Sequence, residues 1–305
     1  MKPALALAVV LAACGPSSSR SNPDATGSGG PGGGSGGDAG ECHDVIDVVF
    51  VLDTSSSMDF VLDQLNTGIQ QVVTASNALA SDAHFGLIVF QDNDFLDNTG
   101  PLDAGAVHTE AATLQARFKY YKDNFTATNR NPGDGITGLT DQNPICEENS
   151  LDALYDAAAK FPWRSNATRV VILVTDDTFL ESPDNYGDRD GDGLENKTDY
   201  PREGNYPAAH TVAETVALLR QNKTRVFTFT RLTPPGILER CGTGRRFPWS
   251  AITNGWTTNY GSNAPIPTQT DGKNFDLAKI QDGSLMLSET INQVVLDSYC
   301  NPVIL

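Results

Sequence analysis

Four short apolar runs stand out along the chain beyond residue 44. They are continuous rather than alternating and rich in β-branched or aromatic residues, which is the pattern of strands buried on both faces of a parallel sheet. The predicted strands cover residues 47–53, 85–90, 170–174 and 225–230.

Between and after these runs, hydrophobic residues recur every three or four positions, as on one face of a helix. This spacing predicts helices at about 62–79, 109–122, 151–160, 208–222 and 287–298. Strands that alternate with helices, without short hairpin signals, predict an α/β fold: a doubly wound, mostly parallel open sheet of the Rossmann-like kind, with loop insertions. Ligands of such sheets bind at the carboxyl ends of the strands.

The first thirteen residues have the pattern of a secretory signal, with Lys2 followed by an apolar run over 4–13. The run is too short to cross a bilayer as a helix. Residues 11–14, Leu-Ala-Ala-Cys, resemble the bacterial lipoprotein box, which implies that residues 1–13 are removed and Cys14 carries lipid. The alternative is a plain signal peptide. We expect an exported chain, lipid-anchored in the bacterial envelope, and Gly15 resembles the outer-membrane sorting pattern.

Residues 14–41 are nearly all Gly, Ser, Pro and Asp, which favours a flexible tether because such a segment cannot bury a core. Residues 42–305 then form one domain. The net charge of −17 argues against nucleic acid as a partner, since phosphate binding needs clustered Lys and Arg. It also argues against docking of the protein surface on anionic lipid, so we expect membrane contact through the lipid anchor only.

Five cysteines occur, and assigning Cys14 to lipid leaves an even set: Cys42, Cys146, Cys241 and Cys300. An exported chain lives where disulfides persist, so two bridges are expected. Four cysteines allow three connectivities. We favour Cys42–Cys300, because chain ends come close together in folds of this kind, and Cys146–Cys241.

The most informative segment leaves the first predicted strand. Asp53, Ser55 and Ser57 alternate along this turn, so one carboxylate and two hydroxyls can converge on one point. Oxygen ligands of this kind suit hard cations such as Mg²⁺, Mn²⁺ or Ca²⁺. The third predicted strand also ends in acid, at Thr175-Asp176.

A strand followed by Asp-x-Ser-x-Ser, with Thr-Asp after a later strand, resembles the metal-ion-dependent adhesion site (MIDAS) of the von Willebrand factor A (VWA) family. The resemblance covers roughly residues 47–300, with long insertions. It implies a non-enzymatic module in which Asp53, Ser55, Ser57 and Asp176 hold Mg²⁺ or Mn²⁺. It also implies cell adhesion or protein binding through that ion, to an unidentified envelope, matrix or extracellular protein.

The family's remaining ligand is usually a Thr shortly before a helix, and Glu148 stands at that place here. Thr137 and Thr140 lie upstream with a spacing that fits worse, and Glu148 could instead serve as a charge at the helix N-terminus. As a ligand beside Asp53 and Asp176, Glu148 would tighten metal binding but weaken attraction for an acidic partner.

A second cation site is predicted within an insertion at residues 180–206. The segment 188–199 matches the D-x-D-x-D-G calcium loop at nearly every position. Its expected Ca²⁺ ligands are Asp188, Asp190, Asp192, the carbonyl of Leu194, Asn196 and Asp199. The alternative is a solvated acidic turn. We expect calcium to order this insertion at the rim of the first site.

Signals for catalysis are absent from the sequence: there is no H-E-x-x-H, and no G-x-S-x-G elbow follows a predicted strand. An enzyme is therefore not expected. A metal-dependent hydrolase with Asp53 as nucleophile is the remaining enzyme alternative, although Ser55 stands where such phosphatases carry a second Asp. Another alternative is a calcium-stabilised structural envelope protein. The segment 234–273 could be a binding rim or a packed loop.

Overall fold

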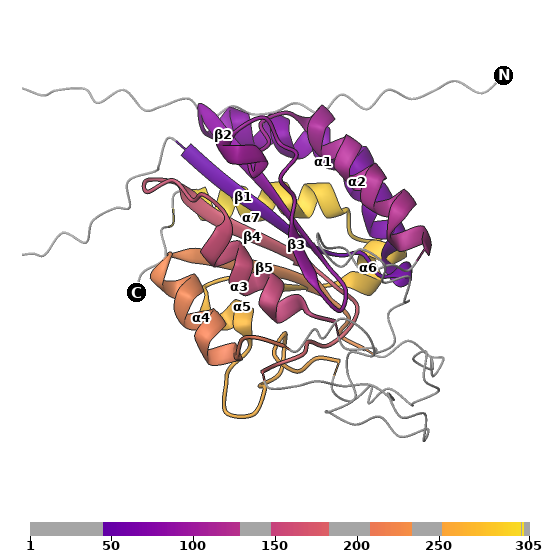
Figure 1. Ribbon diagram of the computed structural model, residues 1–305, viewed down its shortest axis with the longest axis vertical. Helices are drawn as coiled ribbons and strands as arrows, with labels where there is room; N and C mark the ends of the chain where they lie inside the picture. Colours follow the sequence, from indigo (N-terminus) through magenta and orange to yellow (C-terminus); the bar gives the residue numbers. More distant parts are fainter. Residues whose placement is uncertain (1–44, 129–147, 183–207, 234–251, 300, 302–305) are drawn as a thin grey trace, which may run out of the picture. The chain divides into compact units, whose positions relative to one another are not determined.

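The computed structural model describes residues 45–128, 148–182, 208–233, 252–299 and 301, all within one compact unit, 40–305. Six strands form a single sheet in the order β3-β2-β1-β4-β5-β6. The strands are β1 (Val45–Asp53), β2 (Asp82–Phe90), β3 (Asp94–Leu96), β4 (Thr168–Val174), β5 (Thr224–Thr230) and β6 (Asn274–Asp276). All pairs are parallel except β2 with β3, so the predicted fold class is confirmed (Figure 1).

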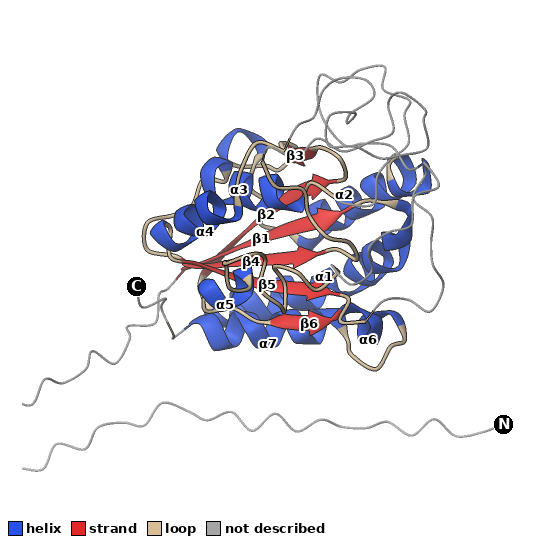
Figure 2. Ribbon diagram, turned by 90° about the horizontal axis from the view of Figure 1, so that it is seen from below, coloured by secondary structure: helices blue, strands red, loops and turns tan. Residues whose placement is uncertain are grey.

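Helices cover both faces of the sheet (Figure 2). On one face lie α1 (Asp59–Leu79), α2 (Ala111–Asn124), α6 (Leu277–Gln281) and α7 (Leu287–Tyr299), and on the other α3 (Ser150–Lys160), α4 (Val212–Gln221) and α5 (Ile266–Gln269). Short 3₁₀ turns are η1 (Ser56–Met58), η2 (Asp103–Gly105) and η3 (Thr126–Thr128).

Alternation along β1 builds a core on each side of the sheet. Val48, Phe50 and Leu52 pack on the α1–α7 side, while Val49 and Val51 pack on the α3–α4 side. All five side chains have zero exposure. This explains why the strand reads as a continuous apolar run rather than as an alternating one.

The structure contains a hairpin that the sequence did not signal. β2 turns back within residues 91–93 into the antiparallel β3, which forms one edge of the sheet. β3, β6, α5 and α6 were not predicted, because elements of three to five residues carry too few positions to show a period. α4 begins at Val212 rather than near 208, since Thr211 and Glu214 form a capping box there.

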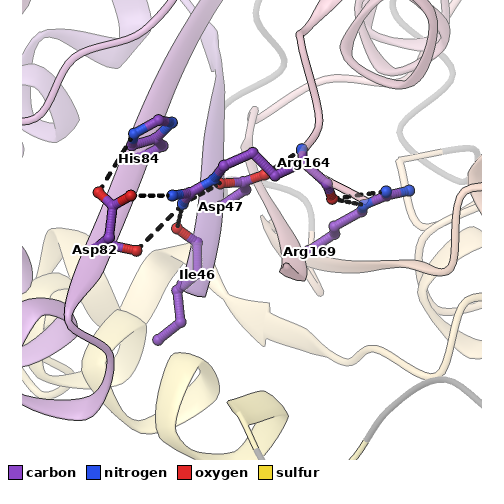
Figure 3. Close-up of polar contacts among 6 residues, drawn as sticks. All are labelled: Ile46, Asp47, Asp82, His84, Arg164 and Arg169. Carbon is purple, nitrogen blue, oxygen red and sulfur yellow. Dashed lines mark hydrogen bonds and ion pairs between the residues drawn. The ribbon is translucent and has the colours of Figure 1, made fainter. Parts of the chain in front are cut away.

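One arginine ties together the edge at which the parallel strands begin (Figure 3). Arg164, in the connection between α3 and β4, donates from Nε to Asp47 Oδ1 (2.8 Å) and from Nη1 to Asp82 Oδ2 (2.6 Å). It also donates to the carbonyl of Ile46 and accepts from Arg169. The starts of β1 and β2 are therefore fixed to the side chain of Arg164, and the start of β4 to its backbone carbonyl.

No helix among the described residues is both long and apolar enough to cross a membrane.

Candidate metal centre

The strand order creates a switch point between β1 and β4. From β1 the chain proceeds outward through β2 and β3, whereas β4, β5 and β6 extend to the other side. Helices on opposite faces leave a crevice at such a point, at the carboxyl ends of the strands. Asp53 closes β1, and Asp176 follows the end of β4 by two residues, so both acids lie at this edge.

Four oxygen-bearing side chains meet there. Ser55 Oγ lies 3.1 Å from Ser57 Oγ, and Ser57 Oγ donates to Asp176 Oδ1 over 2.9 Å. Asp53 Oδ1 accepts from the backbone N–H of Ser55 at 2.7 Å. The structure therefore brings together the four residues that the sequence motif singled out.

The spacing of these oxygens suits a small divalent ion. Ligands of octahedral Mg²⁺ lie about 2.0–2.1 Å from the metal, so adjacent ligands are about 2.9 Å apart. The Ser55–Ser57 and Ser57–Asp176 separations of 3.1 and 2.9 Å match that edge length. The hard oxygen donors that Mg²⁺ or Mn²⁺ requires thus stand at compatible distances.

The turn that carries the serines is held from outside. The carbonyl of Thr54 accepts from Gln91 Nε2 (2.6 Å) and from Thr126 Oγ1 (3.0 Å), and the backbone N–H of Thr54 donates to Phe90 (2.9 Å). Gln91 in turn accepts from the backbone of Asn149, just before α3. Hydrogen bonds through Thr54 and Gln91 therefore join the ends of β1 and β2 to the start of α3.

Asp53 is fully buried, and its second oxygen accepts a 2.8 Å hydrogen bond from the hydroxyl of Thr175. Burial first, and then the neighbouring carboxylate of Asp176, raise the pKa of Asp53 to about 7. The sequence motif did not single out Thr175 as a contact of Asp53, although its position after β4 places it at this edge.

Glu148 lies close to the same group of acids. It is 1 % exposed, and its backbone donates to Thr178 and accepts from Leu180. Burial, followed by the negative charges of Asp53 and nearby aspartates, raises the pKa of Glu148 well above its ordinary value. Within the described segments, no three His, Cys, Asp or Glu side chains gather tightly enough to hold an ion by themselves. The ligand role of Glu148 stays a prediction, and the two hydroxyls are needed to complete a site.

Arg231, one residue after β5, is a neighbour that the sequence reasoning missed. Its Nη2 donates to Asp176 Oδ2 over 3.2 Å, while Asp176 Oδ1 accepts from Ser57. One carboxylate therefore faces both the serine turn and a cation. The position at a strand end was readable from the sequence, but the direction of a long side chain was not.

Several predicted site residues lie outside the described residues. They are Cys14, Cys42, Cys146, Cys241 and Cys300, the calcium loop at 188–199, and the alternative ligands Thr137 and Thr140. Part of the segment 234–273 is described, from residue 252. There Trp256 is 1 % exposed and packs edge-on against Phe179, whereas residues 257–259 and 261–262 are exposed, so the choice between a binding rim and a packed loop stays open.

A comparison with protein-family models found no match, and a comparison with curated proteins found none either. Among solved structures, an aerotolerance-related membrane protein of Bacteroides fragilis is similar at 14 % identity, covering 83 % of this chain and 98 % of that chain, with a TM-score of 0.41. BatB of Bacteroides thetaiotaomicron is similar at 12 % identity (82 % and 99 % covered, TM-score 0.39). Proximal thread matrix protein 1 from the mussel byssus is similar at 15 % identity (86 % and 47 % covered, TM-score 0.41). Likeness at this level assigns neither a family nor an activity.

Proposed function

We propose that this chain is a VWA-type interaction module of an exported lipoprotein, which binds a partner protein through Mg²⁺ or Mn²⁺ held by Asp53, Ser55, Ser57 and Asp176. The observation that carries the proposal is the row of oxygens at the switch point of the sheet, with separations of 3.1 and 2.9 Å. The bound ion supplies a positive charge that a polar or acidic group of an envelope, matrix or extracellular protein can contact.

The proposal includes the features predicted from the ends and insertions of the chain. These are lipidation at Cys14, Ca²⁺ in the loop 188–199, and the disulfides Cys42–Cys300 and Cys146–Cys241. The module is proposed to be non-enzymatic. Its lipid anchor would retain it at the outer membrane, and the tether would hold it on the order of 30 Å from the bilayer.

Metal binding is tested with the full-length chain carrying Cys14→Ser, so that no lipid is attached. Titration calorimetry with MgCl₂ and MnCl₂ should detect one site. At a hundred times its Kd, the metal should stabilise the fold by about 2.7 kcal/mol. Ser57→Ala removes an exposed hydroxyl between Ser55 and Asp176 and should weaken binding. Ser56→Ala removes the adjacent exposed hydroxyl, which is not in the predicted ligand set, and should bind the metal normally.

Partner binding is tested separately, by capture from envelope extracts with and without Mg²⁺. We expect metal-dependent capture by the parent chain and the Ser56→Ala variant, and loss of capture with Ser57→Ala and Asp53→Ala. Capture that is unchanged by both ligand variants, while metal-induced stabilisation is lost, would support the structural alternative instead. A phosphatase assay checks the hydrolase alternative, for which we expect no turnover.

A further inference from the structure

A cavity of about 310 Å³ opens at the edge of the sheet where β4 and β5 begin. Because these strands are parallel to β1, this edge is opposite to the candidate metal centre. The cavity is lined by β4 and β5 together with the ends of α4 and α7. The lining residues that matter for its chemistry are Ser165, Arg169, Lys223, Arg225, Ser298 and Asn301.

Three cations and no carboxylate are among the described residues that line the cavity. None of the three forms an ion pair at salt-bridge distance within the described part of the chain. The negative charge of Asp47 acts on Arg169, but that carboxylate already accepts a 2.8 Å hydrogen bond from Arg164 (Figure 3). The cavity is therefore locally positive in a chain of net charge −17.

Arg169 is held in place by backbone carbonyls rather than by an acid. It donates to the carbonyl of Arg164 at 2.8 Å and to that of Asn222 at 2.7 Å. These bonds fix the guanidinium and leave its charge uncompensated. A preorganised cation loses little conformational freedom when an anion arrives.

Arg225 adds a second observation. Its Nε is buried and has no hydrogen-bond partner among the described residues. The Arg225 side chain as a whole is only half-buried and lines the cavity, so its terminal guanidinium nitrogens, rather than the enclosed Nε, would face a ligand oxygen. In the sheet, Arg225 pairs in register with Val170, the residue after Arg169. Both arginines therefore stand at the same edge, with their side chains leaving opposite faces of the sheet and both lining the cavity that opens at its rim.

The ends of α4 and α7 oppose an anion here, since helix C-termini carry partial negative charge. Each terminus contributes roughly half a unit charge, and two of them amount to about one. Three full positive charges outweigh that sum. The cavity therefore keeps a net positive charge from Arg169, Lys223 and Arg225 after the partial charges of the helix ends are counted.

We propose that this cavity binds a phosphate group, either free or as a phosphomonoester headgroup. Such a group carries up to two negative charges near neutral pH and three acceptor oxygens. Two guanidiniums, one ammonium and the hydroxyl of Ser165 match it better than they match a single carboxylate. The volume corresponds to about ten waters at roughly 30 Å³ each, which leaves room for the remainder of a phosphomonoester.

The test uses the full-length Cys14→Ser chain at low ionic strength, without divalent metal. One arm titrates inorganic phosphate by calorimetry, and the other measures sedimentation with vesicles of phosphatidylcholine containing phosphatidic acid. The second arm tests a lipid source of the phosphate. Arg225→Gln and Lys223→Gln should each weaken binding by about tenfold.

Arg220→Gln is the matched control. Arg220 is an exposed cation near the end of α4 that does not line the cavity, so its loss changes the net charge equally. Phosphate binding that is lost with Arg225→Gln and kept with Arg220→Gln supports the proposal with a free ligand. Vesicle binding with the same variant pattern, without binding of inorganic phosphate, supports the headgroup. No binding in either arm, or equal losses with Arg220→Gln and Arg225→Gln, would overturn it.

Discussion

Asp97, just after β3, is a buried charge with several hydrogen-bond partners. Its carboxylate accepts from Arg117 Nε (2.6 Å), from the hydroxyl of Tyr121 (2.7 Å) and from that of Thr99 (2.6 Å), and it is fully buried. Burial opposes ionisation, yet the nearby His108 ring, 3.6 Å away, and hydrogen bonds from Thr99 and Tyr121 lower the pKa of Asp97 well below its ordinary value. The charge of the carboxylate is therefore stabilised by its hydrogen bonds and not by exposure to water.

Asp97→Asn should therefore destabilise the fold. The substitution leaves Arg117 without its counter-ion and turns one acceptor into a donor that faces Tyr121. Breaking a buried, hydrogen-bonded pair costs about 3–5 kcal/mol, and partial exposure of Arg117 places the expected loss near the lower end. Urea unfolding at pH 7 measures it as a lower midpoint.

The exposed pair Lys119–Asp123 on α2 supplies the control. Asp123→Asn makes the same chemical change and should cost less than about 1 kcal/mol. Equal losses for Asp97→Asn and Asp123→Asn would contradict the role given to burial.

At the residue scale, local motifs were predictable and long-range partners were not. Asp53, Ser55 and Ser57 occupy one turn, so their spacing in the sequence is enough to predict that their oxygens lie close together. Asp97 and Arg117 meet through a hairpin and a helix that are distant in sequence, and no spacing rule links them. The same holds for Arg231 and Asp176.

At the scale of elements, acidic side chains lie in the contact between α3 and β3, a strand that was not predicted. Burial, and then the Asp156 carboxyl, raise the pKa of Asp94 to about 8. Lys160 donates to Asp156 and counteracts this only in part. Asp94 is therefore protonated at neutral pH in the folded interface between β3 and α3.

The sign of the resulting pH dependence follows from linkage. Because its folded pKa is raised, Asp94 keeps a proton that the unfolded chain releases near pH 4. Its contribution to stability should fall as the pH rises from about 4 to about 8. Asp94→Asn keeps the shape and removes the titration. The unfolding free energy of the variant, relative to that of the parent chain, should therefore rise across this pH range. Unfolding free energies at pH 4.5, 6 and 8 measure the difference.

A difference between Asp94→Asn and the parent chain that is constant across the three pH values would contradict this assignment. Asp282→Asn provides a comparison, because Asp282 is exposed and its pKa is lowered by Ser284. That variant should show no such gain at high pH.

The success of prediction at this scale depended on element length. The long strands and helices were found from their periodicity, with ends displaced by a few residues. α4 is instructive: the sequence 211–214 contains a Thr-x-x-Glu capping box that fixes the start, and hydrophobic spacing alone placed it too early. Short edge strands such as β3 and β6 depend on neighbours for their hydrogen bonds, so local sequence signals them weakly.

For the whole molecule, the parallel sheet separates two chemistries. Its carboxyl edge carries the acidic group around Asp53 and Asp176, whereas the opposite edge carries the cavity with Arg169 and Arg225. The net charge predicts an acidic protein, but as a sum over the whole chain it does not show that acidic and basic groups lie at opposite edges of the sheet. Topology determines which strand ends share an edge, so the second site became visible only with the strand order and register.

The insertion predicted to bind calcium is joined to this framework at both ends. The backbone N–H of Ser182 donates to the carbonyl of His210 at 2.9 Å, and Glu181 accepts from the backbone of Val212. Asp152 on α3 accepts from the N–H groups of Ala209 and His210, both at 2.9 Å. Since the chain is fixed on both sides, changes within residues 183–207 need not reach the sheet.

Removal of calcium should therefore affect the insertion and leave the core unchanged. Arg189, Lys197 and Arg202 are trypsin sites within it. With EDTA we expect faster cleavage in residues 183–207 than with CaCl₂, while the two flanking fragments stay associated and the thermal unfolding midpoint of the core moves little. Mass spectrometry locates the cuts, and calorimetry follows the core.

Asp190→Ala removes a predicted calcium ligand and should give the fast cleavage rate even when calcium is present. Asp184→Ala removes an acid from the same insertion but outside the D-x-D-x-D-G pattern, so it should keep the protection by calcium. Cleavage at one rate in calcium and in EDTA would exclude a calcium-ordered insertion. A large fall of the core midpoint in EDTA would instead mean that the ion stabilises the whole domain, because a ligand stabilises only the part that unfolds with loss of its site.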